Sequence, residues 1–334
     1  MGLIGSSKGQ QPWMRWKVLA IAGAFLFVPA VGLGVGLGVG LTQRGGHGDP
    51  SDSDSSSSSS SNDPNSLPSG SSRTSTWQPG VNATWQIVLQ GAIKLDNKTA
   101  PDPDVGIFDL DLFTNDAATF KTLQNDGKKV ICYFSAGSYE NYRPDKDRFQ
   151  PSDLGKTLDG WPDEKWLNLS SPNVRSIMSD RIKLASSKGC DAIDPDNVDG
   201  YQNDNGLNLT QQDSIDFLKF LQGVASSYNM SIGLKNAGDI IPKVISFINF
   251  SVNEQCAEYS ECETFEPFIK AGKPVFHIEY PSGAPNIDAS RATALCSDSG
   301  IGAGSAKFST VLKKMDLDGF VQYCDGKQYT TPLL

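Results

Sequence analysis

The sequence predicts an α/β fold of the (β/α)8 type, a TIM barrel, over residues 77–334 of the 334-residue chain. Three observations lead to this prediction. Short runs rich in β-branched and aromatic residues recur eight times, segments with helical apolar spacing lie between them, and polar residues follow nearly every run at the same end. Strands that alternate with helices in this way form parallel sheets, and a domain of this length has the usual size of one barrel.

The N-terminal region predicts a membrane anchor. Val18–Leu41 is an uncharged apolar run of 24 residues, long enough as a helix to cross a hydrocarbon core of about 30 Å. Lys8, Arg15 and Lys17 precede it, so the positive-inside rule makes residues 1–17 a cytoplasmic tail and leaves the rest outside the cell. We therefore expect an uncleaved signal-anchor and a single-pass type II protein of the cell membrane. The alternative is a cleaved signal peptide, which would give a secreted protein.

Residues 42–76 are rich in Ser, Asp, Pro and Gly, which predicts a flexible, disordered stalk between the anchor and the barrel. Asn-x-Ser/Thr acceptor sites for glycosylation support an exported glycoprotein. There are six of them, at Asn82, Asn97, Asn168, Asn208, Asn229 and Asn249.

The eight predicted strands are Trp85–Gln90, Val105–Leu110, Lys129–Phe134, Cys190–Asp194, Ser231–Lys235, Phe247–Val252, Pro274–Glu279 and Gly319–Tyr323. The predicted helices between them are Ala117–Asp126, Val174–Lys188, Gln211–Tyr228, Gly238–Ser246, Glu263–Ala271 and Lys307–Met315. Ser171-Pro172-Asn173 and Gly189 provide start and stop signals for the second helix, and Thr210 is a candidate cap for the third. A doubly wound open sheet is the alternative, but it would need a Gly-rich loop that does not follow the first strand.

Charge and cysteine content narrow the function classes. Asp and Glu number 38 against 29 Lys and Arg, so nucleic acid is not an expected partner. Only two histidines are present, which argues against zinc-type clusters, and we expect no metal site and no cofactor. The even number of cysteines fits disulfides in an oxidising compartment. The spacing allows Cys256 with Cys262 and Cys296 with Cys324, whereas Cys132 and Cys190 fall at adjacent strands and are either bonded or simply buried.

Polar side chains gather at the C-terminal ends of the predicted strands, where barrel enzymes carry their active sites. Carboxylates dominate among them, and cleavage of a glycosidic bond requires two carboxyl groups, one on each side of the bond. A calcium site formed by Asp194, Asp196 and Asp199 would lack the glutamate that closes a calcium loop. A serine hydrolase would need a Gly-x-Ser-x-Gly elbow, which the sequence does not contain. The pattern therefore favours a glycoside hydrolase.

Three segments carry a family resemblance. They are Val130-Ile-Cys-Tyr-Phe-Ser-Ala-Gly137, Gly189-Cys-Asp-Ala-Ile-Asp-Pro-Asp-Asn-Val-Asp-Gly-Tyr201 and Asn253-Glu254. The sequence from about Trp85 to Tyr323 resembles the endo-α-1,4-polygalactosaminidases of glycoside hydrolase family 114. Fungal members of this family are membrane-anchored enzymes that cut galactosaminogalactan, an exopolysaccharide with partly deacetylated, cationic galactosamine.

The resemblance implies that Asp196 and Glu254 are the catalytic pair. By analogy with other barrel α-galactosidases, Asp196 is expected to be the nucleophile and Glu254 the acid/base of a retaining reaction. Asp194 is the rival nucleophile, and the choice between retention and inversion stays open. The expected substrate-binding residues are Asp109, Asp111, Tyr133, Asp194, Asn236, Glu279 and Tyr280.

The expected partner is a cationic galactosamine-containing polysaccharide, because acidic subsites suit an ammonium-bearing sugar and the net charge is −9. We expect a monomer. The alternative function is a non-catalytic, polysaccharide-binding protein of the cell surface on a barrel scaffold, which would not need both Asp196 and Glu254.

Overall fold

The structure, a computed structural model, describes residues 75–95 and 102–334. The predicted cytoplasmic tail, the predicted span Val18–Leu41 and nearly all of the predicted stalk lie outside the described residues. Within the described part of the chain, no helix combines the length and the apolar character that crossing a membrane requires. The anchor therefore stays a prediction from the sequence.

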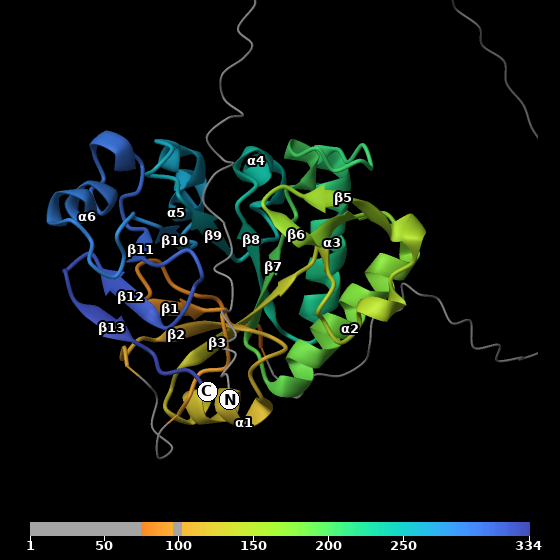
Figure 1. The fold of residues 1–334 in the computed structure, drawn as a ribbon, viewed down its shortest axis with the longest axis horizontal. Coiled ribbons are helices and arrows are strands. Elements are labelled where there is room, and N and C mark those ends of the chain that lie inside the picture. The colour runs from red at the N-terminus through yellow and green to blue at the C-terminus, as the bar shows by residue number, and fades with distance from the viewer. Residues whose placement is uncertain (1–74, 96–101) are drawn as a thin grey trace, which may run out of the picture. The chain divides into compact units, whose positions relative to one another are not determined.

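The main element is a ten-stranded sheet that curls on itself (Figure 1). The first eight strands in its order pair parallel with their neighbours, and the last two pair antiparallel. In sheet order the strands are β1 (Trp85–Val88), β2 (Ile107–Asp111), β3 (Lys129–Ser135), β7 (Ala192–Asp196), β8 (Ser231–Lys235), β9 (Phe250–Glu254), β10 (Val275–Glu279), β11 (Ser309–Leu312), β12 (Phe320–Tyr323) and β13 (Gln328–Thr330). Eight parallel strands agree with the predicted barrel class.

The two edges of this sheet approach each other. The backbone N–H of Leu89, just after β1, donates to the carbonyl of Leu317 at 2.9 Å, and the Tyr323 hydroxyl donates to the carbonyl of Trp85 at 2.8 Å. Among the described residues no strand ladder joins β1 to β12 or β13. The architecture is thus a curled sheet of TIM-like form, which confirms the coarse fold class but not a fully closed barrel.

The last part of the chain departs from the prediction. The eighth parallel strand is β11, which pairs with β10 from Phe276 opposite Ser309 to Glu279 opposite Leu312. The predicted helix Lys307–Met315 is therefore wrong. The predicted strand Gly319–Tyr323 corresponds to β12, but it runs antiparallel to β11. Over so few positions, apolar residues spaced by three and four are compatible with a helix or with a strand. Pairing with the edge of β10 makes this segment a strand.

The helices are α1 (Ala117–Asn125), α2 (Pro172–Lys188), α3 (Gln211–Ser227), α4 (Ile241–Val244), α5 (Glu266–Lys270) and α6 (Ala289–Leu295). The predicted caps are confirmed. The Ser171 hydroxyl accepts the N–H of Val174, Gly189 ends α2 with φ 98°, and the Thr210 hydroxyl accepts the N–H of Asp213. The predicted helices Gly238–Ser246 and Glu263–Ala271 are shorter than expected, because each begins with a 3-10 turn.

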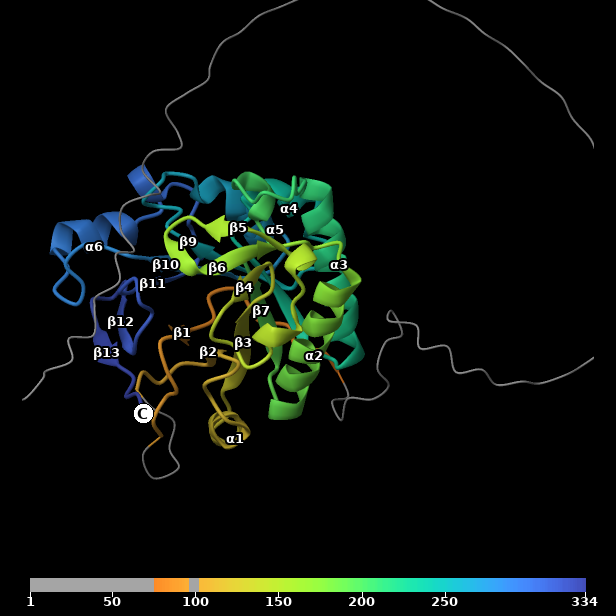
Figure 2. The same ribbon diagram turned by 45° about the vertical axis from the view of Figure 1, so that its right-hand side comes forward.

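A second, three-stranded antiparallel sheet is inserted between β3 and α2, and the sequence prediction missed it. In sheet order its strands are β4 (Ser138–Glu140), β6 (Trp161–Leu167) and β5 (Leu154–Leu158), visible in front in Figure 2. Asp159-Gly160 forms the turn between β5 and β6, and Gly160 has φ 82°, a conformation that glycine adopts without strain. This dipeptide between two strands was the signal for the hairpin.

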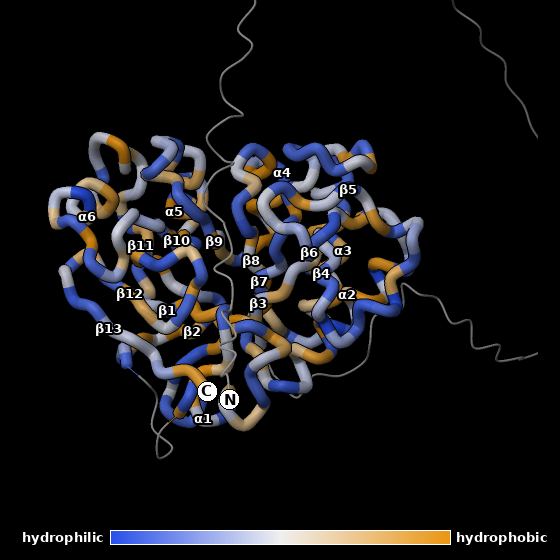
Figure 3. The backbone as a smooth tube through the Cα atoms, viewed as in Figure 1, coloured by the Kyte–Doolittle hydropathy of each residue, from blue (hydrophilic) through white to orange (hydrophobic). Residues whose placement is uncertain are grey.

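The curled sheet separates two apolar clusters, and Figure 3 shows hydrophobic and hydrophilic residues interleaved along its strands. The smaller cluster, which includes Trp85, Ile107, Val252 and Phe276, fills the interior of the curl. The larger cluster packs the outer face of the sheet against the helices. Three disulfides stabilise the fold, and they pair Cys132 with Cys190, Cys256 with Cys262 and Cys296 with Cys324. Both pairings that the spacing allowed are confirmed. Cys132 and Cys190, which the sequence left as either bonded or buried, form a disulfide.

Candidate active site

Strand alternation decides which polar side chains face the interior of the sheet. On β2, Ile107 belongs to the interior cluster, whereas Phe108 and Leu110 belong to the outer one. Asp109 and Asp111 therefore continue the inner face of β2. The same rule applies to Asp194 and Asp196 after Ala192, to Lys235 after Gly233, to Glu254 after Val252 and to Tyr280 after Ile278. Because parallel strands end at the same edge, these side chains meet above the interior apolar cluster.

The ammonium group of Lys235 joins the two predicted catalytic carboxylates. Its Nζ lies 3.1 Å from Oδ2 of Asp196 and 3.3 Å from Oε2 of Glu254. The lysine side chain is 2% exposed, whereas the carboxylates are 17% and 18% exposed. Burial alone would lower the pKa of Lys235, but the charges of Asp196 and Glu254 outweigh it and hold the pKa above its ordinary value. Lys235 is therefore a fixed cation between two reachable carboxylates.

Two tyrosines also hold these carboxylates. The Tyr133 hydroxyl donates to Oδ2 of Asp196 at 2.9 Å, and the Tyr280 hydroxyl donates to Oε1 of Glu254. Burial, reinforced by the charge of the bonded carboxylate, raises the pKa of both phenols well above the ordinary value. Both tyrosines thus remain protonated hydrogen-bond donors at any physiological pH.

Asn236 fixes the position of Glu254 by two hydrogen bonds. Its Nδ2 donates to Oε2 of Glu254 at 2.9 Å, and its Oδ1 accepts the backbone N–H of Glu254 at 2.9 Å. Asn236 has φ 48°, which turns the chain just beyond β8 so that the side chain reaches β9. The structure therefore brings together Asp196, Glu254, Tyr133, Asn236 and Tyr280.

Asp109 and Asp194 lie deeper and are fully buried. Their carboxyl oxygens have no hydrogen-bond partner among the described residues. Burial is the largest cause of the raised pKa of both carboxyls. The charge of Asp194 adds to the shift of Asp109, and for Asp194 the partial compensation by Lys235 leaves a pKa of about 7. Unlike the Asp196 carboxylate, neither of these two carboxyl groups is accessible to a substrate in this conformation.

Asp111 has its oxygens occupied. Oδ2 pairs with the guanidinium of Arg143 at 2.7 Å, and Oδ1 accepts the backbone N–H groups of Phe113 and Thr114, each at 2.9 Å. Arg143 also binds Glu140 at 2.7 Å and 2.9 Å. The structure places Asp111 in an ion-pair cluster beside the site rather than among the side chains around Lys235.

A carboxyl from the inserted sheet is linked through Ser138 to Asn197, the residue that follows Asp196. The Ser138 hydroxyl donates to Oε2 of Glu164 at 2.8 Å and accepts the side-chain N–H of Asn197 at 2.8 Å. The backbone N–H of Asn197 in turn donates to Oδ1 of Asp196 at 2.7 Å. Burial, followed by the charge of Glu140, raises the pKa of Glu164 to about 8. A neutral glutamic acid thus supports the strand end next to Asp196.

Comparison with known proteins identifies the family of the chain. The model of glycoside-hydrolase family GH114 matches residues 67–329. The chain belongs to glycoside hydrolase family 114. Ega3 of Aspergillus fumigatus, whose crystal structure is a complex with galactosamine, is 56% identical with a TM-score of 0.70, and the match covers 76% of this chain and 100% of that one. A search of curated protein sequences gave no significant match.

A distant neighbour supports the fold alone. The glycoside hydrolase domain of PelA from Pseudomonas aeruginosa is 12% identical with a TM-score of 0.52, and the match covers 70% of this chain and 95% of that one. The family resemblance stated from the sequence is thus confirmed, and the chain is a glycoside hydrolase.

In this family-114 domain Glu279 lies on the outer face of β10, where it is fully buried. Its Oε1 accepts the backbone N–H of Ala257 at 2.8 Å and lies 2.7 Å from Nε2 of His277. Ala257 belongs to the loop that follows Glu254 on β9. The structure therefore places Glu279 where it holds this loop, apart from the side chains around Lys235.

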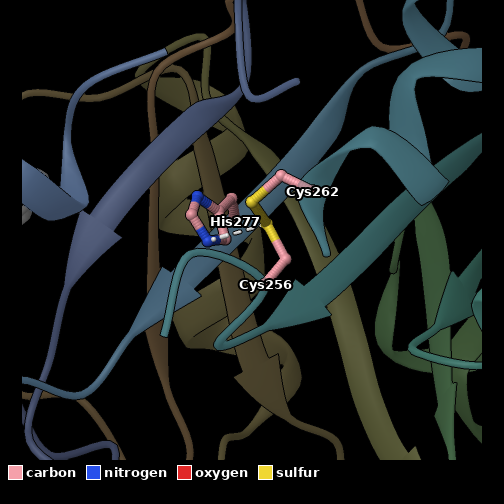
Figure 4. A group of neighbouring side chains, drawn as sticks. All are labelled: Cys256, Cys262 and His277. Carbon is pink, nitrogen blue, oxygen red and sulfur yellow. Dashed lines mark hydrogen bonds between the residues drawn. A yellow bond between two sulfur atoms is a disulfide. The ribbon is translucent and has the colours of Figure 1, made fainter. Parts of the chain in front are cut away.

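This loop and β10 together carry the one group of His, Cys, Asp or Glu side chains in the described residues whose ligand atoms lie close enough together for a metal ion. Cys256, Cys262 and His277 place these atoms within 4.8 Å of one another (Figure 4). The two sulfurs are bonded to each other, however, and a disulfide offers no thiolate ligand. The cluster is a structural support beneath the loop.

Several residues of the family-114 site were not predicted. The sequence placed Lys235 at a strand end without giving it a role, although a charged residue that follows Gly233 by two positions must share its inward face. Glu164, Ser138 and Asn197 could not be assigned while the inserted sheet was missed. Arg143 lies in a loop, and no spacing signal connects it to Asp111.

Proposed function

We propose that this family-114 enzyme is an endo-acting hydrolase that cleaves α-1,4-linked galactosamine in a galactosaminogalactan-type exopolysaccharide. The observation that supports it most is the pair of accessible carboxylates, Asp196 and Glu254, held on one lysine ammonium. The likeness to Ega3, crystallised with galactosamine, supports the choice of sugar. Family membership disfavours the purely binding alternative.

The proposed mechanism is retaining. Asp196 attacks the anomeric carbon while Glu254 donates its proton to the departing glycosidic oxygen, which breaks the bond and leaves a glycosyl ester on Asp196. Glu254, now ionised, then takes a proton from water, and the resulting attack on the anomeric carbon releases Asp196 and restores both groups. Retention is proposed by analogy with other barrel α-galactosidases, and the separation of the two carboxyl groups, about 5 Å for retention and about 6.5 Å or more for inversion, is the geometric criterion.

The side chains around the pair have distinct proposed roles. Tyr133 and Lys235 orient Asp196 as the nucleophile, because both contact the same oxygen, Oδ2. Tyr280 and Asn236 orient Glu254, whose two oxygens they bind. Asp196 is favoured over Asp194 as the nucleophile, because Asp194 has no exposed surface.

The chemical character of the substrate follows from charge. The net charge of −9 attracts a polycation over a distance. A galactosamine residue with a free ammonium group gains from this field, whereas N-acetylgalactosamine is neutral and does not. We therefore propose that deacetylated segments are cleaved preferentially.

The proposed location is the outer face of the cell membrane, with the domain exported behind the apolar run Val18–Leu41. Three disulfides in the described residues fit an oxidising compartment outside the cytoplasm. Cleavage in the stalk would release the same domain as a secreted enzyme.

The test is incubation of the detergent-solubilised full chain with deacetylated and with fully acetylated galactosaminogalactan. Mass spectrometry of the products should show oligosaccharides of several galactosamine units from the deacetylated polymer and few from the acetylated one. Release of monosaccharide alone would contradict endo-action. Retention of the polymer without any product would support the binding protein instead.

A further inference from the structure

Tyr142 is an exposed aromatic side chain in the loop after β4. It is 59% exposed, and apart from Leu334 no other large hydrophobic side chain in the described part of the chain is exposed. Exposing a tyrosine ring to water forgoes the stabilisation that burying it would give. The exposed ring of Tyr142 is therefore a candidate surface for a ligand of this sugar-cleaving domain.

The ring of Tyr142 is held in one orientation. Its hydroxyl donates to Oε1 of Glu140 at 2.7 Å, and the guanidinium carbon of Arg143 lies 5.2 Å from the ring centroid. The Arg143 side chain is 7% exposed, and its guanidinium carbon also lies 4.7 Å from the centroid of the Phe113 ring. A ring fixed in advance loses little conformational freedom when a ligand binds to it.

The ring lies at the same end of the sheet as the catalytic pair. Arg143 pairs with Asp111, the last residue of β2, at 2.7 Å. Glu140, which binds the Tyr142 hydroxyl, ends β4, and β4 follows directly on β3. On β3, Ser135 lies opposite Asp196 in the register of the sheet. The charge of Glu140 also acts on the phenol of Tyr133, the group that donates to Asp196.

The chemistry of the ring suits a sugar. A galactose-type ring has one face of C–H groups that packs on an aromatic face, and the ammonium group of galactosamine is attracted to the electron-rich face of tyrosine. An enzyme that cuts within a chain must also hold sugar units beyond the two that flank the broken bond. An exposed tyrosine, held by Glu140 at the same end of the sheet as the pair, meets both requirements.

We propose that Tyr142 is the platform of a distal sugar subsite, which stacks on a galactosamine unit of the polymer away from the bond that is cut. The inference rests on the proposed function and extends it to the length of chain that the enzyme recognises. The inserted sheet then acts as a substrate-binding extension of the barrel, because its strand β4 carries the residue that anchors the ring.

The test compares Tyr142→Ala with Tyr142→Phe in the full chain. On long deacetylated polymer, Tyr142→Ala should raise KM about tenfold with a smaller change in kcat, whereas Tyr142→Phe, which keeps the ring and loses only the hydroxyl, should keep the KM of the parent protein. An equal rise in KM for both variants would assign the effect to the bond with Glu140 and overturn the proposal. A loss confined to kcat would also overturn it, because it would place Tyr142 within the support of the catalytic pair.

A binding measurement separates this proposal from the proposed function. In the Asp196→Asn background, retardation of the protein in gels containing deacetylated polymer reports binding without hydrolysis. Adding Tyr142→Ala should weaken retardation, and adding Tyr142→Phe should not. Weaker retardation together with an inactive parent protein would sustain the subsite and reject the hydrolase. Unchanged retardation with an active parent protein would do the reverse.

Discussion

The ammonium nitrogen of Lys235 lies 3.1 Å from Oδ2 of Asp196, and the same nitrogen lies 3.3 Å from Oε2 of Glu254. This buried ammonium group bridges the carboxylates at the ends of β7 and β9, and its positive charge offsets their mutual repulsion. The site therefore depends on a balance of charge that removal of Lys235 would upset.

Lys235→Met tests this balance. We expect kcat to fall at least about a hundredfold, because the nucleophile loses its ion partner. Lys219→Met, at an exposed position on α3, is the control and should behave as the parent protein. An unchanged kcat in Lys235→Met would refute the role of the cation.

Tyr280→Phe tests the support of the acid/base. Loss of the hydrogen bond to Oε1 of Glu254 should lower kcat about tenfold, the usual scale of one hydrogen bond, with little change in KM. Tyr228→Phe is a matched control, because the buried Tyr228 hydroxyl has no hydrogen-bond partner among the described residues. Equal kcat values for the two variants, measured on the same polymer, would argue against the assignment of Glu254.

Glu164→Gln tests the raised pKa of Glu164, a carboxyl group of the inserted sheet. The folded chain holds the Glu164 proton up to a pH of about 8, whereas the unfolded chain releases it near pH 4.3. The stability that this proton gives is present below pH 4.3 and is lost as the pH rises through about 8. Since one pKa unit equals about 1.4 kcal/mol, the loss is on the order of a few kcal/mol.

Thermal unfolding between pH 5 and pH 9, about the titration range of the group, measures the effect. Glu164→Gln cannot ionise, so its melting temperature should fall less over this range than that of the parent protein. Other groups with raised pKa values, such as Asp194, titrate in both proteins and cancel in the comparison. Parallel curves for the two proteins would show that the carboxyl is already ionised in the fold.

The disulfides should contribute unequally to stability. Cys132 and Cys190 are separated by 58 positions and Cys256 and Cys262 by 6, and the cost of closing the unfolded loop grows with its length. Replacing the first pair by alanine should lower the free energy of unfolding by about 4 kcal/mol, against about 2 kcal/mol for the second pair. Denaturant unfolding without reductant measures both. A larger loss for the short loop would show that the support of the loop after Glu254 outweighs chain entropy.

Two regularities of parallel strands help to predict the site from the sequence. The strands end at a common edge, and side chains alternate between the two faces along each strand. The common edge allowed the ends of the fourth and sixth predicted strands to be placed near each other before the fold was known, and the family resemblance singled out Asp196 and Glu254 there. The alternation of side chains was used less fully. Glu279 and Tyr280 are neighbours in an extended segment and cannot both face inward, and the structure gives the inward position to Tyr280.

Other features needed three-dimensional contacts. The segment Ser309–Leu312 fits a helix or a strand by its apolar spacing, and only the free edge of β10 decides between them. Residue type could not show that Lys235 bridges two other strands, because its partners lie 39 and 19 positions away in the chain. The role of Glu164 depended on the inserted sheet, for which Asp159-Gly160 was a local signal that was not used.

The most direct test of the central claim is the release of reducing ends from deacetylated galactosaminogalactan by Asp196→Asn, Glu254→Gln and Asp194→Asn. The first two variants should lose at least about a thousandfold in rate while they unfold at the temperature of the parent protein, because each removes one half of the catalytic pair. Asp194→Asn should retain measurable activity. Full activity in Asp196→Asn or in Glu254→Gln would contradict the assignment of the pair.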